Sequence, residues 1–166
     1  DAIEISERPI AITHANPTFW HPALRNKSDE VLQALGQSGG MLGFSIYPHH
    51  LKGGSGCTID SFCEMIARAA ELMGVDNLGI GSDLCQGQPD SVVEWMRVGR
   101  WTKQVDYGEG SVSDAGFPTM PSWFGGNRDF CNLVKGLRDY GFLEEDVEKI
   151  MGGNWLAFFK RSFGPE

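Results

Sequence analysis

The chain has 166 residues, which is long enough to bury a hydrophobic core as one domain. Its formal net charge of −8 argues against nucleic acid or an anionic membrane surface as a partner. No run of about 18 apolar residues is present, so no membrane-spanning helix is predicted. The 4 cysteines form no Cys-x-x-Cys pair, and we expect them to be reduced, in a cytoplasmic protein without a structural zinc site.

The first part of the chain predicts a strand, a helix and a second strand, in that order. The apolar run Ile10-Ala-Ile is typical of a buried strand, which ends at His14. A helix is expected near residues 29–37, because Ser28 is a suitable N-cap and acidic residues follow it in the first turn. Two glycines then break the chain, and residues 41–47 predict the next strand.

A longer amphipathic helix is predicted after Thr58, which is its expected N-cap. Gly74 is well placed as the C-terminal cap, and residues 78–81 predict the third strand. The alternation of strand, loop and helix indicates parallel βα units. The apolar face of the helix recurs at helical spacing and consists of Ile59, Phe62, Cys63, Ile66, Ala69, Ala70 and Met73.

The rest of the chain is less regular. A short helix is expected over residues 89–97, within a stretch at about 84–126 that is rich in glycine, serine, proline and aromatic residues. Because aromatic residues argue against disorder, we interpret this stretch as a folded insertion. Residues 128–140 predict a helix that ends at Gly141, and a last helix is expected to run from residue 143 past Trp155.

Three polar residues stand where functional groups are expected in a parallel αβ fold. His14 ends the first strand, Arg25 lies in the loop that follows, and Asp83 comes directly after the third strand. An imidazole can bind zinc, a guanidinium matches a carboxylate, and a carboxylate can move protons. Each also has an ordinary structural explanation: a satisfied histidine, a solvated arginine and a turn-forming aspartate.

Five segments, in order, resemble the C-terminal half of the membrane dipeptidase family (metallopeptidase family M19, amidohydrolase superfamily). The resemblance implies an α/β fold, a (β/α)8 TIM barrel of which this chain supplies roughly the last three βα units. Residues 1–166 are then the C-terminal half of the barrel, with the insertion at about 84–126. The segments are Pro9-Ile-Ala-Ile-Thr-His14-Ala, Arg25-Asn26 with Ser28-Asp-Glu-Val-Leu, Gly39-Gly40-Met-Leu-Gly-Phe, Gly79-Ile-Gly-Ser-Asp83 and Gly152-Gly-Asn-Trp-Leu.

The resemblance also implies a role for each polar residue. His14 matches a zinc-binding histidine of the family, Arg25 the arginine that holds the substrate's terminal carboxylate, and Asp83 the aspartate that handles protons beside the metal-bound water. Family members carry two zinc ions and hydrolyse dipeptides, and we expect the complete enzyme to be a homodimer. At Leu84-Cys-Gln, where the family usually has Phe-Asp-Gly, the chain departs from the pattern, which leaves its substrate preference open.

The family's His-x-Asp metal motif, its bridging glutamate and its other ligand histidine have no counterpart in the sequence. A complete barrel needs at least about 200 residues, and the chain does not begin with methionine. We therefore expect an N-terminal half, from the same precursor or from a second chain, to complete the site.

Two other functions stay open. One is a different amidohydrolase that acts on N-acyl amino acids or lactams; the other is a half-barrel that only binds a partner, whose open sheet edges would need to be covered. The loop histidines His21, His49 and His50 are either substrate contacts or ordinary polar loop residues. Asn154-Trp155 is expected to pack the last helix, with the indole N–H hydrogen-bonded.

Overall fold

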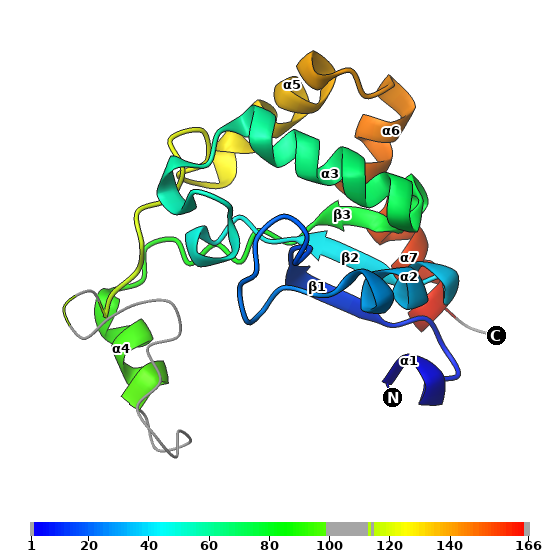
Figure 1. The fold of residues 1–166 in the computed structure, drawn as a ribbon, viewed down its shortest axis with the longest axis horizontal. Helices are drawn as coiled ribbons and strands as arrows, with labels where there is room; N and C mark the ends of the chain where they lie inside the picture. The colour runs from blue at the N-terminus through cyan, green and yellow to red at the C-terminus, as the bar shows by residue number, and fades with distance from the viewer. Residues whose placement is uncertain (1, 99–112, 114, 165–166) are drawn as a thin grey trace.

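The computed structural model describes residues 2–98, 113 and 115–164, and its centre is a three-stranded parallel sheet (Figure 1). The strands are β1 (Ala11–Ala15), β2 (Met41–Phe44) and β3 (Leu78–Ile80), and they lie side by side in the order β1-β2-β3. The predicted strands are thus all present, although β2 ends three residues earlier than expected.

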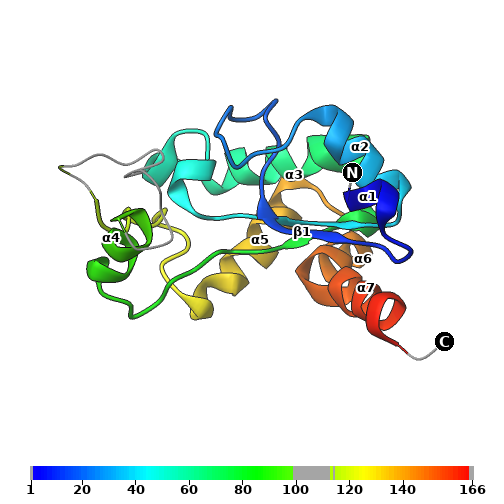
Figure 2. The ribbon, with the colours of Figure 1, turned by 90° about the horizontal axis from the view of Figure 1, so that it is seen from below.

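Helices α2 (Asp29–Gln37) and α3 (Ile59–Met73) connect the strands and cover one face of the sheet (Figures 1 and 2). The predicted N-cap of α3 is confirmed, since the Thr58 hydroxyl accepts a hydrogen bond from the Ser61 amide at 3.2 Å. Gly74 ends this helix with a positive φ of 81°. Ser28 occupies the N-cap position of α2, but its side chain makes no capping hydrogen bond.

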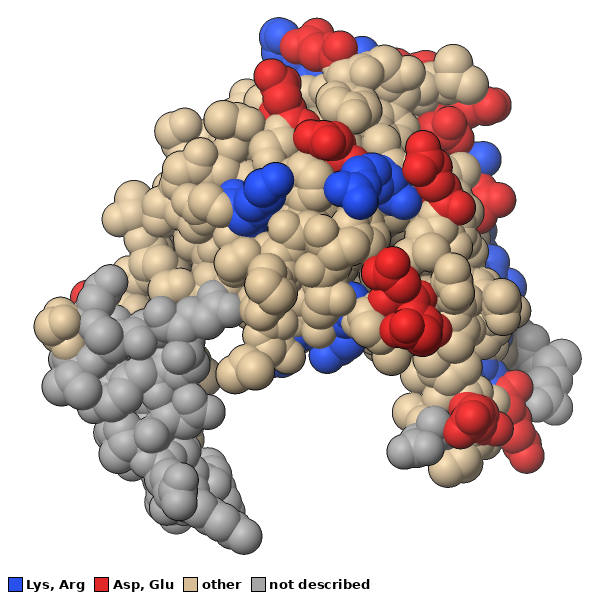
Figure 3. Space-filling model, viewed as in Figure 1, with Lys and Arg blue, Asp and Glu red and all other residues tan. Residues whose placement is uncertain are grey.

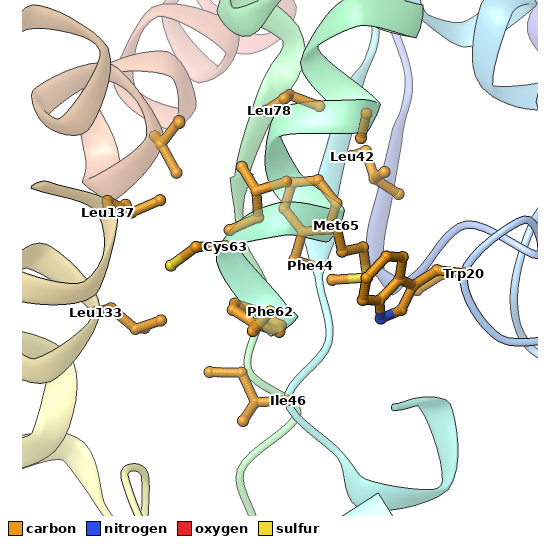
Figure 4. Packing of buried hydrophobic residues seen from close by; sticks show 14 of the residues in the cluster. Trp20, Leu42, Phe44, Ile46, Phe62, Cys63, Met65, Leu78, Leu133 and Leu137 are labelled. Carbon is orange, nitrogen blue, oxygen red and sulfur yellow. The ribbon is translucent and has the colours of Figure 1, made fainter. Parts of the chain in front are cut away.

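The main core lies between this face and α5 (Phe130–Tyr140), as Figure 4 shows. Phe44 meets Phe62 of α3 edge to face, with ring centroids 6.3 Å apart. Leu133 and Leu137 bring α5 against the other side of α3, next to Cys63 (Figure 4). The apolar positions predicted for α3 therefore pack both against the sheet and against α5.

The opposite face of the sheet is covered by the C-terminal helices (Figure 2). A single last helix was expected, but the structure has α6 (Glu144–Glu148), a π-helical segment Lys149–Gly153 and α7 (Asn154–Phe163), with non-helical backbone at Gly152. The predicted packing role of Asn154-Trp155 is confirmed. The Asn154 amide donates to the carbonyls of Val75 and Leu78 at 2.8 Å, and the Trp155 indole donates to that of Ile80 at 3.1 Å.

The remaining elements are short. They are α1 (Ala2–Ile5), α4 (Asp90–Val98) and 3-10 turns at Pro48–His50, Gly54–Gly56, Val75–Asn77 and Asn127–Asp129. Helix α4 confirms the predicted helix at 89–97, while residues 99–112 and 114 of the expected insertion lie outside the described residues. None of the described helices is long and apolar enough to cross a membrane.

Acidic and basic side chains are interspersed over the face shown in Figure 3. Two ion pairs join the C-terminal helices to their surroundings: Arg138 pairs with Glu144, and the Lys149 ammonium lies 3.0 Å from the Asp76 carboxylate. All four residues are partly exposed, so solvent screening makes both pairs weak.

Candidate functional site

The end of β1 carries a bulge at Thr13 and His14. Ile12 pairs with Leu42 and Ala15 with Phe44, so two residues of β1 lie opposite a single residue of β2. A bulge of this kind redirects the side chains of the extra residues, and bulges are common beside active sites. It places His14 at the carboxyl edge of the sheet, half-buried.

The sheet curves toward the face that carries Gly43 and Gly81. A Cβ atom at either position would overlap the carbonyl oxygen of Thr13 and lie 2.9 Å from its carbonyl carbon. In a flat sheet, β1 and β3 would be about 10 Å apart, because neighbouring strands are spaced by about 4.8 Å. The bulge and the curvature together bring Thr13 of β1 against the residue that follows β3.

The structure brings two of the three predicted site residues together. A terminal nitrogen of Arg25 (Nη1) lies 3.5 Å from Nε2 of His14, and Nδ1 of His14 lies 2.8 Å from the Thr13 hydroxyl. Because a guanidinium can only donate, Nε2 is the acceptor, and the ring proton is on Nδ1, where it is donated to Thr13. The lone pair on Nε2 is thus directed toward the side on which Arg25 lies.

A buried polar network lies directly beneath this pair. The side chain of Asn16 donates to the carbonyls of Ser45 and His50 at 3.0 and 3.1 Å and accepts from the Ser45 amide at 3.0 Å. The Asn26 side chain accepts from the Asn16 amide at 2.9 Å and donates to the carbonyls of His21 and His50 at 2.8 and 3.1 Å. Since Asn26 follows Arg25, the network holds the arginine loop against the end of β1.

The imidazole of His50 is part of the same network. Its Nδ1 lies 2.8 Å from the Ser45 hydroxyl, which also accepts the Tyr47 amide at 3.2 Å. Burial, followed by the positive charge of Arg25 and the neighbouring histidines His14, His49 and His21, lowers the pKa of His50 to about 4. His50 is therefore neutral at pH 7, and no charge is buried beneath the site.

The sequence suggested substrate contacts or ordinary polar loop residues for His21, His49 and His50, and neither interpretation included a buried hydrogen-bond network. His50 is buried and not a surface residue, and its carbonyl and its Nδ1 bind neighbouring parts of the chain. His21 supplies a carbonyl acceptor, and the His49 ring packs edge to face on Tyr47 at 5.4 Å. Asn16 was not predicted; the only signal in the sequence is a polar residue two positions after the end of the predicted strand.

Asp83 stands at the same edge of the sheet, three positions after the end of β3. Its φ of 56° makes it the only non-glycine residue with a positive φ in the described part of the chain. This conformation is uncommon outside glycine, and strained residues cluster at functional sites. Its carboxylate is exposed, so it is available to a ligand at this edge.

Within the described residues, no group of three or more His, Cys, Asp or Glu side chains could hold a metal ion. A catalytic zinc site needs about three protein ligands, so these residues do not form one alone. His14 fits as a single ligand: Nδ1 is held by Thr13, as is usual for metal-binding histidines, and Nε2 carries the lone pair.

Residues 1–105 match the family model described as membrane dipeptidase, peptidase family M19. The chain belongs to this family. The chain is also similar to Dipeptidase tcpJ of Claviceps purpurea, with 27% identity over 164 residues, which are 96% of this chain and 31% of that protein. The chain spans about a third of the length of Dipeptidase tcpJ and of Dipeptidase ataJ of Aspergillus terreus (31% and 32%).

Solved structures support the fold assigned to this member of the membrane dipeptidase family. An amidohydrolase from Pseudomonas aeruginosa superposes with a TM-score of 0.87 and 29% identity, over 98% of this chain and 48% of that one. A metallopeptidase from Rhodobacter sphaeroides, bound to a phosphinate mimic of L-Ala-D-Ala, superposes with a TM-score of 0.74 and 20% identity, over 98% of this chain and 39% of that one. At 20% identity, the second likeness shows the fold alone.

Proposed function

We propose that the chain is the C-terminal half of a zinc-dependent dipeptidase of the membrane dipeptidase family. The observation that carries the proposal is the contact between His14 and Arg25, at 3.5 Å, on the sheet edge that also presents Asp83. A metal-binding imidazole, a carboxylate-binding guanidinium and an exposed carboxylate are the groups that dipeptide hydrolysis needs. The dipeptidase names of the relatives support the same activity.

The proposed architecture is a (β/α)8 barrel of which residues 1–166 form the C-terminal half. The curvature between Thr13 and Gly81 is what a barrel wall requires. In the described sheet β1 and β3 are the outer strands, and outer strands invite pairing with further strands. On α7, Leu156, Phe159 and Phe163 are 48–77% exposed, an apolar stripe that a second half would cover.

The chemistry divides between the three residues. Arg25 would bind the C-terminal carboxylate of the dipeptide through two parallel hydrogen bonds and so place the scissile carbonyl beside His14. His14 would hold one of two zinc ions, which supply Lewis acidity and an activated water when bound. Asp83 would accept the proton of the attacking water and return it to the amine as the C–N bond breaks.

A second candidate is another amidohydrolase that acts on N-acyl amino acids or lactams. It is favoured by the similarity to the Pseudomonas aeruginosa amidohydrolase and by Leu84-Cys-Gln after Asp83. Both candidates use the same His14, Arg25 and Asp83. They differ in whether a free amine is present at the other end of the substrate, so substrate choice separates them.

The experiment uses the full-length protein with zinc and a panel of L,L-dipeptides, L-Ala-D-Ala and N-acyl amino acids. Hydrolysis of dipeptides supports the first candidate, while cleavage of N-acyl substrates alone supports the second. Arg25→Lys keeps the charge but loses the planar fork, and is expected to raise KM about tenfold. Arg161→Lys, at an exposed position of α7, is the matched control. An unchanged KM in Arg25→Lys contradicts the assignment.

Native mass spectrometry tests the assembly in the same preparation. The proposal requires a second half, joined or separate, two zinc masses, and a homodimer of the complete enzyme. A metal-free single chain that stays monomeric contradicts it and favours the non-catalytic half-barrel.

A further inference from the structure

We propose that Gly81, together with Gly43, is a positioning residue for His14. The two glycines form a notch that holds the Thr13 carbonyl, and this notch fixes the bulge that directs the His14 ring. The inference rests on the proposed function only for the ligand that His14 binds. Its structural part, that position 81 sets the orientation of residue 14, can be tested without metal.

The notch excludes any side chain for a steric reason alone. A Cβ at position 81 would overlap the Thr13 oxygen and lie 2.9 Å from its carbonyl carbon and 3.2 Å from the Gly43 Cα. Real Cβ atoms do not approach other atoms within 3.0 Å, so something would have to move. Neither glycine has a positive φ, so alanine suits the backbone at both positions.

The neighbour that would have to move is the peptide group of the bulge itself. Positions 12 and 15, on either side, are fixed by pairing with β2, so the displacement would be confined to Thr13 and His14. The Thr13 hydroxyl bonds His14 Nδ1 at 2.8 Å, so a shift of Thr13 is transmitted to the ring. The displacement of the ring would change the position of Nε2, the atom that faces Arg25.

This gives the Gly79-Ile-Gly-Ser-Asp83 segment a second role. Its last glycine is needed by a different strand, because it accommodates the carbonyl of residue 13 rather than a ligand. The segment then carries one candidate catalytic group, Asp83, and sets the position of another, His14.

Two other glycines provide matched controls. Gly79→Ala lies in β3, two positions before Gly81 and on the same face, but its methyl would collide with Trp155, 2.7 Å from Cδ1, and not with Thr13. Gly56→Ala has no atom within 4 Å of its added methyl. Gly79→Ala introduces a steric clash of its own without disturbing the bulge, and Gly56→Ala introduces the glycine-to-alanine change without any clash.

The experiment compares these variants in the full-length protein by 15N NMR of the His14 ring without metal, with His14→Gln to identify the signal. Gly81→Ala is expected to shift the ring nitrogens away from the Nδ1–H form. Gly79→Ala and Gly56→Ala should keep the wild-type shifts, even though Gly79→Ala lowers the melting temperature. Unchanged ring shifts in a folded Gly81→Ala protein overturn the inference.

Zinc affinity, measured by competition with a chelator, is the second measurement. Partners that orient a metal-binding histidine typically change affinity by 10–100-fold, so Gly81→Ala should weaken zinc binding at least about tenfold and Gly79→Ala should not. If the wild type binds no zinc but the ring shifts move in Gly81→Ala, the proposed function fails and the structural inference stands.

Should Gly81→Ala not fold, Thr13→Val examines the same coupling without entering the notch. Valine has the shape of threonine but lacks the hydroxyl that accepts from His14 Nδ1. Its expected result is a redistribution of the ring proton and weaker zinc binding. Unchanged shifts in Thr13→Val would show that Thr13 does not orient His14, which also overturns the inference.

Discussion

The helix-covered face of the sheet and its carboxyl edge are held together by different interactions. On the face, large apolar side chains point toward α3 and are fully buried: Leu42, Phe44, Ile46 and Leu78 (Figure 4). At the edge, the buried groups are polar, namely Asn16, Asn26, Ser45 and His50. Apolar burial supplies free energy without direction, whereas hydrogen bonds fix orientation. The helix-covered face therefore contributes stability, and the carboxyl edge fixes the orientation of the groups at the site.

The largest effect on stability is expected from a change on the face. Phe44→Ala removes a fully buried ring that packs on Phe62 and should lower the free energy of unfolding by about 3–5 kcal/mol. Leu143→Ala removes a side chain that is 63% exposed and should change it by less than about 0.5 kcal/mol. Urea denaturation measures both, and equal losses would contradict the comparison.

A change in the polar network should have a smaller but clear effect. Asn16→Leu keeps the volume but leaves the Ser45 amide without its acceptor and removes a donor from two carbonyls. We expect a loss of about 2–3 kcal/mol, the cost of unsatisfied buried polar groups. Gln33→Leu, at an exposed position of α2, is the control in the same denaturation series. A neutral Asn16→Leu would mean that water replaces these bonds.

The buried His50 should make the edge sensitive to acid. Its folded pKa is lowered to about 4 from 6.5, so the unfolded state takes up a proton first as the pH falls. Its share of the stability is complete above pH 6.5 and is lost between pH 6.5 and pH 4, by about 2 kcal/mol. His50→Gln should remove this part of the pH dependence of unfolding. If the free energy of unfolding changes with pH in the same way in both proteins, the pKa of His50 is not lowered in the folded state.

The smallest effect on stability, with the largest on activity, is expected at Asp83. Asparagine also tolerates the positive φ of this position, so Asp83→Asn should change the free energy of unfolding by less than about 0.5 kcal/mol. It cannot accept the proton, so kcat should fall at least about a hundredfold with zinc still bound. Asp60→Asn, in the exposed first turn of α3, is the control. Full activity in Asp83→Asn would refute the assigned role.

The sequence predicted the elements whose signals are local. The bounds of α2 and α3 are those expected, because N-caps, helical periodicity and a terminal glycine are all encoded within each segment. The break at Gly152 was not predicted, since the flanking residues continue a helical pattern and only the anchoring of Asn154 and Trp155 to β3 requires the chain to turn. The parallel order followed from the alternation of strands and helices.

The sequence could nominate candidate site residues but not their geometry. His14 and Asp83 stand out because each follows an apolar run, and Arg25 lies in the loop after the first; the structure places His14 and Arg25 in contact. The bulge that directs His14 depends on pairing with β2, and the bonds of Asn16 join residues 29 and 34 positions apart. Such long-range contacts produce no periodic pattern in the amino-acid sequence.

The notch beneath Thr13 also has a consequence for the order of folding. Its walls are Gly43 of β2 and Gly81 after β3, so β1 and β2 can pair before the notch exists. Contacts between distant residues form slowly, because the intervening loop must close first. We therefore expect the His14 ring to reach its final orientation only when the third strand docks against the paired β1 and β2.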